Sequence, residues 1–446
     1  MDSVRREVLG LAVPAMGSNV LRLLVTTVDM IMVGRLGPIE IGAVGTSNIL
    51  VFLFQAIMIA VSNGAMVVVA YFYGKREYSE ANEAFSESAI VSILLGVVMG
   101  SIGFFFGKSM LSFMTDSEAV LSNAESYIDM LMPCLPFMFF GFLCSHVFKA
   151  SGDAITPLYL DGIANVINII LDYIFIFGVG AFPSMGVAGA ALASSVAFVI
   201  NAFLYSILFL SKKRRLRIFL PTRIAYLRDV FYYGFPTGIE QIAAQISNFI
   251  YTAMVGSLGE IALAAHVVGT RAEAFSFMPG FGYYTSSSVL VGQGLGAGDV
   301  KKARRGAMES LFQGILLTGV LGLILVIFPR ELSMIFTNEP GVIELSRIYL
   351  ILMGVSQVTL AMDFAMRGAL RASGNTTYPM WITIIGRFVV RLGVAYLLGF
   401  VLEMGLFGIW LGMMADMFFK GILEYVKFIR TDLTKAKISS RGKERL

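Results

Sequence analysis

Long apolar stretches recur along the whole chain and alternate with short polar segments. Residues 88–106 with their flanks, 155–178, 186–210 and 306–328 are examples. Each is about twenty residues or longer, enough for a helix to cross a hydrocarbon layer of roughly 30 Å. The pattern predicts an all-α, polytopic membrane protein with twelve transmembrane helices. Their centres are expected near residues 21, 57, 97, 135, 167, 199, 243, 278, 317, 357, 389 and 418.

Composition supports a membrane protein and excludes several classes of site. The 446 residues are 57% hydrophobic and only 14% charged, whereas a soluble domain has about a quarter charged residues. Two cysteines and two histidines argue against a disulfide framework or the usual zinc site. The first apolar stretch carries Arg22 and Asp29 and is too long for a signal peptide, so we interpret it as a mature span.

Basic residues gather in every second segment between the predicted helices. They occur at Arg5 and Arg6, at Lys75 and Arg76, in the stretch 212–217, at 301–305 and in the tail. Cytoplasmic loops of membrane proteins carry such an excess of lysine and arginine. Both termini are therefore expected to be cytoplasmic, which requires an even number of spans. We predict a multi-pass protein of the cell membrane.

The two halves of the chain repeat one another. Pro14 corresponds to Pro236, and the same offset of 222 residues pairs Tyr127 with Tyr349 and the Ala-Ser-Gly at 150–152 with that at 372–374. Six spans per half give a parallel repeat, an architecture common in secondary transporters. We therefore predict two pseudo-symmetric six-helix lobes. The expected boundaries are 1–211 for the N-terminal lobe, 212–228 for a basic cytoplasmic linker, 229–430 for the C-terminal lobe and 431–446 for a cytoplasmic tail.

Two carboxylates of the first half lie well inside predicted spans. Asp29 is in span 1, and Asp172 is in span 5 within Asn-Ile-Ile-Leu-Asp, four residues after Asn168 and on the same helix face. A buried acid costs about 2.5–3.5 kcal/mol on insertion scales and usually faces the protein interior or water. If both acids open onto one shared cavity, they can bind H⁺ or Na⁺. The alternative is structural, with Arg22 neutralising one of them.

The second half carries more charge inside its spans. Asp363 with Arg367 and Asp416 with Lys420 are opposite charges four residues apart and are interpreted as structural bridges. Glu240 has no such local partner and is a candidate for a substrate cavity. Further candidates for such a cavity, or for a secondary site, are Arg22, Glu273, Asp363 and Arg391. Pro14 and Pro236 each remove a helix hydrogen bond and are hinge candidates, although a simple kink would also explain them.

Several motifs together resemble the multidrug and toxic compound extrusion (MATE) family of twelve-helix antiporters, over nearly the whole chain. They are Pro14 with VDMIMVGRLG (28–37), ASGDAITP (150–157), NIILDYIFIFG (168–178), GVAGAALASS (186–195), ALAAH (262–266), VGQGLGAGD (291–299) and RLGVAYLLGF (391–400). The resemblance implies a cation site, for H⁺ or Na⁺, at Asp29, Asn168 and Asp172. A span-6 hydroxyl falls on Ser194, where the family has threonine. An acid used by some members falls on Glu240, whereas Asp363 lies about a turn from their span-10 aspartate.

These observations favour a secondary active antiporter that exports amphipathic, cationic organic compounds by alternating access. The alternative is a flippase for lipid-linked precursors, which shares the two-lobe architecture in related families and needs a strongly cationic cavity. A membrane enzyme would need a catalytic constellation, and the sequence presents none. We therefore expect no enzymatic activity, no cofactor and no nucleic-acid partner. The expected partners are small organic substrates and the lipid bilayer, and the protein is expected to be a monomer.

Overall fold

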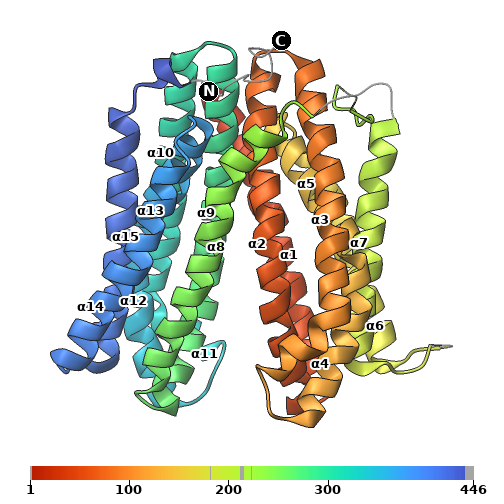
Figure 1. The fold of residues 1–446 in the computed structure, drawn as a ribbon. Helices are drawn as coiled ribbons and strands as arrows, with labels where there is room; N and C mark the ends of the chain where they lie inside the picture. Colours follow the sequence, from red (N-terminus) through yellow and green to blue (C-terminus); the bar gives the residue numbers. More distant parts are fainter. Residues whose placement is uncertain (1–2, 181, 211–214, 222–223, 437–446) are drawn as a thin grey trace. The chain divides into compact units, whose positions relative to one another are not determined.

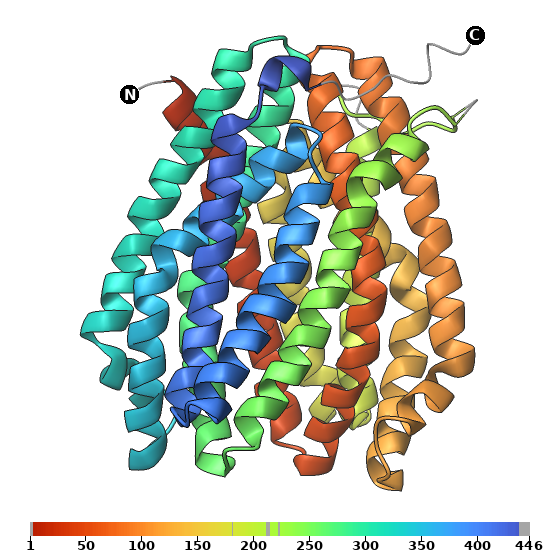
Figure 2. The same cartoon turned by 60° about the vertical axis from the view of Figure 1, so that its left-hand side comes forward.

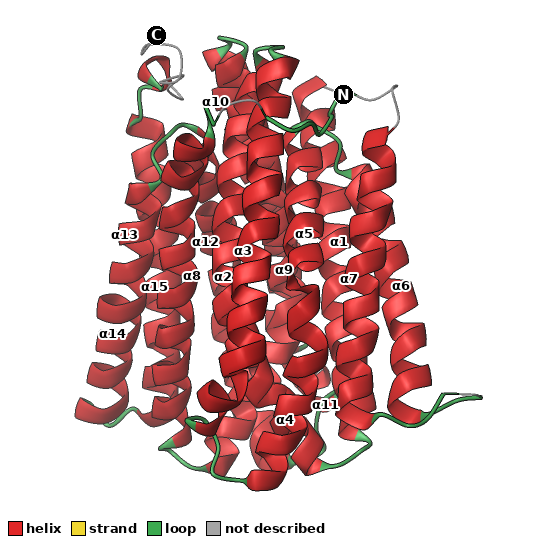
Figure 3. Ribbon diagram, turned by 45° about the vertical axis from the view of Figure 1, so that its right-hand side comes forward, coloured by secondary structure: helices red, strands yellow, loops and turns green. Residues whose placement is uncertain are grey.

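The computed structural model describes residues 3–180, 182–210, 215–221 and 224–436. Within these ranges every regular element is a helix (Figures 1 and 3), which confirms the predicted fold class. The basic residues Lys212, Lys213 and Arg214 of the predicted linker and the tail from residue 437 lie outside the described residues. The helices of the first half are α1 (Ser3–Gly34), α2 (Pro38–Gly74), α3 (Tyr78–Ser112), α4 (Glu118–Leu131), η1 (Met132–Cys134), α5 (Leu135–Ala150), α6 (Ile155–Phe177) and α7 (Gly186–Leu210).

The second half continues with longer helices and several short ones. They are α8 (Leu227–Gly256), α9 (Glu260–Gly296), α10 (Val300–Ile327), α11 (Pro329–Met334), α12 (Pro340–Ala372), α13 (Thr377–Ile385), η2 (Gly386–Arg391), α14 (Leu392–Tyr396), η3 (Leu397–Val401), α15 (Gly405–Arg430) and η4 (Leu433–Lys435). Of these, η2 and η3 are π-helical.

Helical stretches occur at all twelve predicted spans. Ten of those in the described residues are long and apolar enough to cross a membrane, counting Glu118–Ala150 and Thr377–Val401 as one stretch each. The other two are α8 and α9, which have 30 and 37 residues. Both carry charges in mid-helix, Glu240 in α8 and Arg271 with Glu273 in α9, which lowers their hydropathy. The layout agrees with twelve spans in two lobes.

Helix boundaries reproduce the sequence repeat. Four helices of the first half begin 222 residues before a helix of the second half. These pairs of first residues are Pro38 and Glu260, Tyr78 and Val300, Glu118 and Pro340, and Ile155 and Thr377. A proline begins α2 and α12, where the missing amide hydrogen costs no helix bond. The duplicated sequence therefore builds duplicated local structure.

The chain divides into two compact units. The N-terminal unit contains Gly17–Phe235, and the C-terminal unit contains the described residues up to Met16 together with those from Pro236 to 436. Both divisions fall inside a continuous helix, α1 and α8, and close to a proline, Pro14 or Pro236. The first turns of each half are thus assigned to the unit built mainly by the other half.

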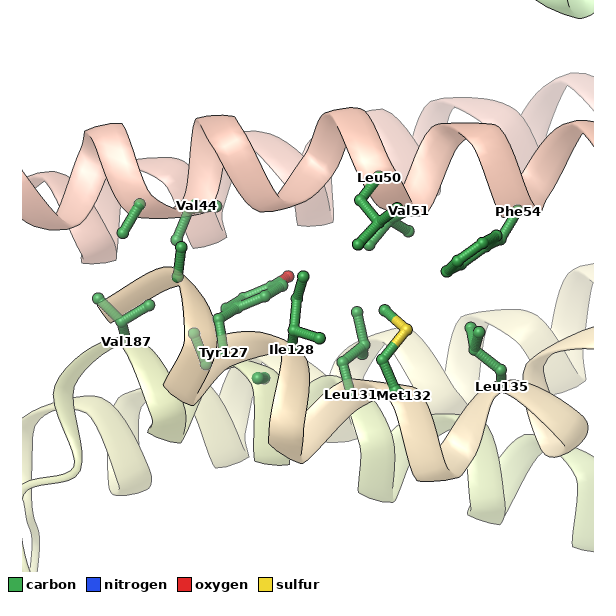
Figure 4. Close-up of a cluster of buried hydrophobic side chains, with 14 of the residues drawn as sticks. Val44, Leu50, Val51, Phe54, Tyr127, Ile128, Leu131, Met132, Leu135 and Val187 are labelled. Carbon is green, nitrogen blue, oxygen red and sulfur yellow. The ribbon is translucent and has the colours of Figure 1, made fainter. Parts of the chain in front are cut away.

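An apolar cluster fixes α2 against the broken helix α4–η1–α5 in the N-terminal unit. Phe54 and Val51 of α2 point toward Leu131, Met132 and Leu135, all of them buried (Figure 4). Lipid tails are as apolar as these side chains, so close packing rather than escape from water stabilises such a contact. The cluster holds α4, which carries one wall of the cavity described below.

Backbone groups before α8 are bound by side chains of α3. The Glu87 carboxylate, which is buried, accepts hydrogen bonds from the amides of Ala225 at 2.7 Å and Tyr226 at 2.8 Å. Ser86 accepts a further bond from the amide of Phe219 at 3.1 Å. A carboxylate placed at the start of a helix also matches the helix dipole. These bonds attach the described part of the connection between the two halves to the N-terminal unit.

Close backbone approach positions the π-helical segment η2 beside α15, within the same unit (Figure 2). A Cβ atom at Gly386 would lie 2.4 Å from Oδ1 of Asp416, and one at Gly412 would lie 2.6 Å from the carbonyl oxygen of Arg391. Only glycine fits at these two positions. The close contact brings the arginines of η2 beside the charged face of α15.

Candidate functional site

A cavity of about 320 Å³ lies in the N-terminal unit. Asp29 and Arg22 of α1, Asn168 of α6 and Ser194 of α7 line it together with residues of α2, α4 and α5. Four of the residues singled out from the sequence are thus brought to one chamber. Methionine and phenylalanine side chains cover much of the remaining wall, namely those of Met30, Met58, Met138, Phe137, Phe142 and Phe198.

Asp172 lies behind the cavity wall rather than on it. The cavity lining includes Asp29 and Asn168 but not Asp172, whose exposure is 0%. The expectation that both acids open directly onto the chamber is therefore wrong for Asp172. The carboxyl groups of Asp29 and Asp172 nevertheless lie close enough to interact with each other, so Asp29 stands between its partner acid and the cavity.

Neither acid of this pair is neutralised by a base within the described residues. Both Asp172 oxygens, Asp29 Oδ1 and the Asn168 amide nitrogen are buried without a hydrogen-bond partner in the protein. No ion pair joins Arg22 to either acid; its guanidinium lies 5.3 Å from the centre of the Phe142 ring. The structural alternative, an acid locked to Arg22, is thus not what the fold builds.

Tyr127 of α4 is a further member of this site that sequence reasoning did not select. Its side chain is 9% exposed, lines the cavity and feels the charges of both Asp29 and Asp172. The repeat contained the signal, because Tyr127 pairs with Tyr349. In the C-terminal unit the Tyr349 hydroxyl donates a hydrogen bond of 2.5 Å to Glu273. A tyrosine thus accompanies a buried acid in each half.

Asp161 is a third acid at the N-terminal cavity, and it was also missed. Its carboxylate accepts hydrogen bonds from Ser145 at 3.1 Å, from the Asn201 amide at 3.1 Å and from the Tyr205 hydroxyl at 3.0 Å. Lys149, itself buried, adds a favourable charge interaction. Asp161 is therefore a satisfied carboxylate, in contrast to Asp172 eleven residues later on the same helix.

A second cavity, of about 470 Å³, lies in the C-terminal unit. The sequence-selected residues Glu240, Glu273, Asp363 and Arg391 all line it. The expected bridges from Asp363 to Arg367 and from Asp416 to Lys420 are present. The charged side chains of this cavity come from α8, α9, α12, η2 and α15.

Glu240 has a partner that its own helix does not reveal. It forms a buried ion pair with Arg371 of α12, whose second nitrogen donates to the Tyr284 hydroxyl at 2.9 Å. Arg367 lies 4.0 Å from the same Glu240 oxygen. The absence of a local partner was read as a sign of a cavity role, yet the partner stands 131 residues away in sequence. Glu240 lines the cavity as an occupied ion pair, unlike the unpaired acids of the N-terminal unit.

The described residues contain no group of three or more His, Cys, Asp or Glu side chains placed to hold a metal ion. The N-terminal site has two carboxylates, an amide and a phenol instead. Oxygen atoms of this kind suit a proton or a hard monovalent cation taken up and released during transport.

Comparison with known proteins agrees with this geometry. The MatE family model matches residues 14–174 and again 236–397, once in each half of the repeat. The probable multidrug resistance protein NorM of Thermotoga maritima is 31% identical over 450 residues, covering 99% of this chain and 97% of that protein. The uncharacterized transporter YisQ of Bacillus subtilis is 25% identical, covering 89% of this chain and 88% of that protein.

A solved structure has the same fold. It is described as the outward-facing conformation of a multidrug resistance MATE family transporter of the MOP superfamily, and it has a TM-score of 0.90 at 20% identity, with 96% of each chain covered. The family is one of transporters, so the expectation of a transporter rather than an enzyme is confirmed. The chain belongs to the MatE family of multi-pass membrane transporters.

Proposed function

We propose that this transporter exports amphipathic, cationic organic compounds in exchange for H⁺ or Na⁺. The printed names of relatives support drug export. The choice of a cation-coupled antiporter rests on one observation in this chain, the unpaired carboxyl pair Asp29 and Asp172 beside the N-terminal cavity.

The coupling step follows from the cost of burying charge. An ionised acid inside a membrane span is unfavourable by a few kcal/mol, and a second carboxylate nearby adds repulsion. Uptake of a positive ion by Asp29 and Asp172 removes both penalties and favours a closed, drier cavity. Asn168 and the Tyr127 hydroxyl supply further oxygen atoms for a bound cation. Release of the ion restores the charge and, with it, the attraction for a cationic substrate.

The lining of the N-terminal cavity suits an amphipathic cation. Asp29 supplies the negative charge, and the flexible thioethers of Met30, Met58 and Met138 can adapt to different apolar bodies. Movement of the ion down the membrane potential contributes about 2.3 kcal/mol per charge per 100 mV. Pro14 and Pro236, where the two units exchange helix ends, are proposed as the hinges of alternating access.

A lipid-linked precursor flippase is less well supported. Such a protein needs a cavity with a strong excess of positive charge, and Arg22 is the one lysine or arginine among the described residues that line the N-terminal chamber. The C-terminal chamber has more bases, but Arg367 and Arg371 are paired with acids.

The test is dye efflux from proteoliposomes that contain the purified protein. Efflux of a cationic dye is measured under an imposed pH gradient, under a sodium gradient and without a gradient. We expect acceleration by one of the two gradients and its loss in Asp172→Asn. Asp116→Asn, an exposed acid between α3 and α4, is the matched control and should behave like the wild type. Full gradient-driven efflux by Asp172→Asn would refute the proposal.

A further inference from the structure

Three basic side chains of the C-terminal unit share a single carboxylate. Oδ2 of Asp416, which is fully buried, lies 3.0 Å from Nζ of Lys420, 3.3 Å from Nε of Arg391 and 3.9 Å from Nε of Arg387. One negative charge therefore serves three positive charges. Excess charge inside a membrane-spanning region is costly, so this cluster favours a further anion.

The neighbouring acids do not supply that anion. Glu240 is paired with Arg371 and Asp363 with Arg367. Lys420 is 3.9 Å from Asp363, a distant second contact. Two other buried acids remain, each beside a group that favours its neutral form or binds it elsewhere.

The first of these acids is Glu424, which lies against Asp363. Like charges side by side disfavour ionisation, so these two carboxyls are best accommodated with a shared proton. The second is Glu273, which interacts with Arg391 but is hydrogen-bonded by the Tyr349 hydroxyl. The positive excess is therefore located at Arg387 and Arg391.

Both arginines reach the same point on the cavity wall. Arg387 and Arg391 donate from Nη1 to Oδ1 of Asn248 at 2.9 Å and 3.0 Å, and all three residues line the cavity. Their Nε atoms are buried without a hydrogen-bond partner, and the Arg391 side chain is about 5% exposed. A neutral amide oxygen here occupies the position that an oxyanion oxygen would bind more strongly.

The rest of this wall is apolar and aromatic. Tyr251 lies under the Arg391 guanidinium, 5.3 Å from it, and Phe277 and Phe281 form an edge-to-face pair on the same cavity. A volume of about 470 Å³ is within the range of sites for small organic ligands. Charge at one point and aromatic surface beside it suit an amphipathic anion.

The two arginines are particular to the C-terminal half. At the repeat offset of 222 residues, Arg387 and Arg391 correspond to Asn165 and Ile169. The π-helical turn η2 presents both of them, and π-helical turns are frequent at functional sites. The fold itself does not require the pair, because the first half builds the same helix without it.

We propose that Arg387 and Arg391 form a binding subsite for the oxyanion group of an amphipathic compound, a carboxylate or a phosphate. The ligand replaces Asn248 Oδ1 as the acceptor between the two guanidinium groups, and its apolar body lies against Tyr251 and the phenylalanines. This site goes beyond the proposed cation exchange and does not depend on it.

The test is direct binding to the full-length protein in nanodiscs. The probe is pyrenebutyrate, with pyrenebutanol as a neutral probe of the same body, followed by fluorescence. We expect the carboxylate to bind at least about tenfold more tightly than the alcohol, since charge-assisted hydrogen bonds are the stronger ones. Arg387→Gln with Arg391→Gln should abolish this preference. Arg347→Gln, a half-exposed arginine of α12, is the control that should keep it.

Two further variants keep the outcome decisive. Asp416→Asn removes the competing carboxylate and should tighten carboxylate binding, which decides the matter if the double arginine variant does not fold. Asp172→Asn should leave binding unchanged, so failure of the proposed antiport and failure of this site can be told apart. Equal binding of the two probes, or unchanged preference in the double arginine variant, would overturn the proposal.

The origin of the oxyanion is distinguished by lipid composition. Displacement of pyrenebutyrate by nanodiscs rich in anionic phospholipid would support a lipid phosphate as the natural ligand. Displacement by soluble organic carboxylates in nanodiscs of neutral lipid would support a soluble one. An affinity of the probe that neither changes would contradict an oxyanion site.

Discussion

Replacing an acid by its amide should have opposite effects on stability in the two units. Glu240→Gln breaks a buried ion pair, and Asp172→Asn removes a buried acid that has no partner. Both substitutions change one carboxylate into an amide of nearly the same shape. The difference therefore reports the surroundings of each acid rather than the size of the side chain.

The loss in Glu240→Gln can be estimated from its contacts. The nitrogen of Arg367 at 4.0 Å is worth about 4 kcal/mol at an effective dielectric constant near 20, and Arg371 is closer still. Desolvation already offsets part of this gain, so the expected cost is that of breaking a buried pair, about 3–5 kcal/mol. Arg371, only 4% exposed, would be left without its carboxylate.

Asp172→Asn should instead be neutral or stabilising. Neither Asp172 oxygen has a hydrogen-bond partner, and the amide removes the repulsion from Asp29. The assay is the midpoint of thermal unfolding of purified protein in detergent, with Arg371→Gln and Glu240→Gln/Arg371→Gln added to complete a double-mutant cycle. The double variant should lose less than the sum of the two singles. Additive losses, or a large loss in Asp172→Asn, would refute this reasoning.

Three other substitutions follow from the packing. Glu87→Gln should cost about 1–3 kcal/mol, because an amide nitrogen then faces backbone donors before α8; the thermal midpoint measures this, and no change would show that the carboxylate is not needed there. Gly386→Ala should lower the midpoint or the yield of folded protein, since a Cβ would lie 2.4 Å from Asp416, and unchanged unfolding would contradict that contact. Asp161→Asn should lower stability by disturbing its three hydrogen bonds while gradient-driven efflux persists, so loss of coupling without loss of stability would count against its structural role.

Much of the fold could be predicted because membrane spans and repeats are local patterns. Hydropathy located the helical stretches, and the repeat identified α8 and α9 as spans although charge lowers their hydropathy. Asp29 and Asp172 were recognisable because an acid inside an apolar stretch is rare. The i,i+4 bridges could likewise be read from spacing alone.

The partners of these residues could not be read from one chain position. The pair of Glu240 and Arg371 joins α8 to α12 across 131 residues, and helix packing alone brings them together. Tyr127 looked like an ordinary aromatic filler, and Asp161 lies close enough to the start of α6 to resemble an interfacial acid. The position of Asp172 behind Asp29, rather than on the cavity wall, depends on how α6 is rotated against α1.

Cation movement linked to substrate movement tests the central role of Asp29 and Asp172 most directly. A cationic dye is added to proteoliposomes, and internal pH is followed with a trapped indicator while sodium is followed with radioactive tracer. Wild-type protein should move one of these cations opposite to the dye in a fixed ratio, and Asp172→Asn should move dye down its gradient with no linked cation. A wild-type protein without linked cation movement, or an Asp172→Asn variant with undiminished linkage, would contradict coupling at this carboxyl pair.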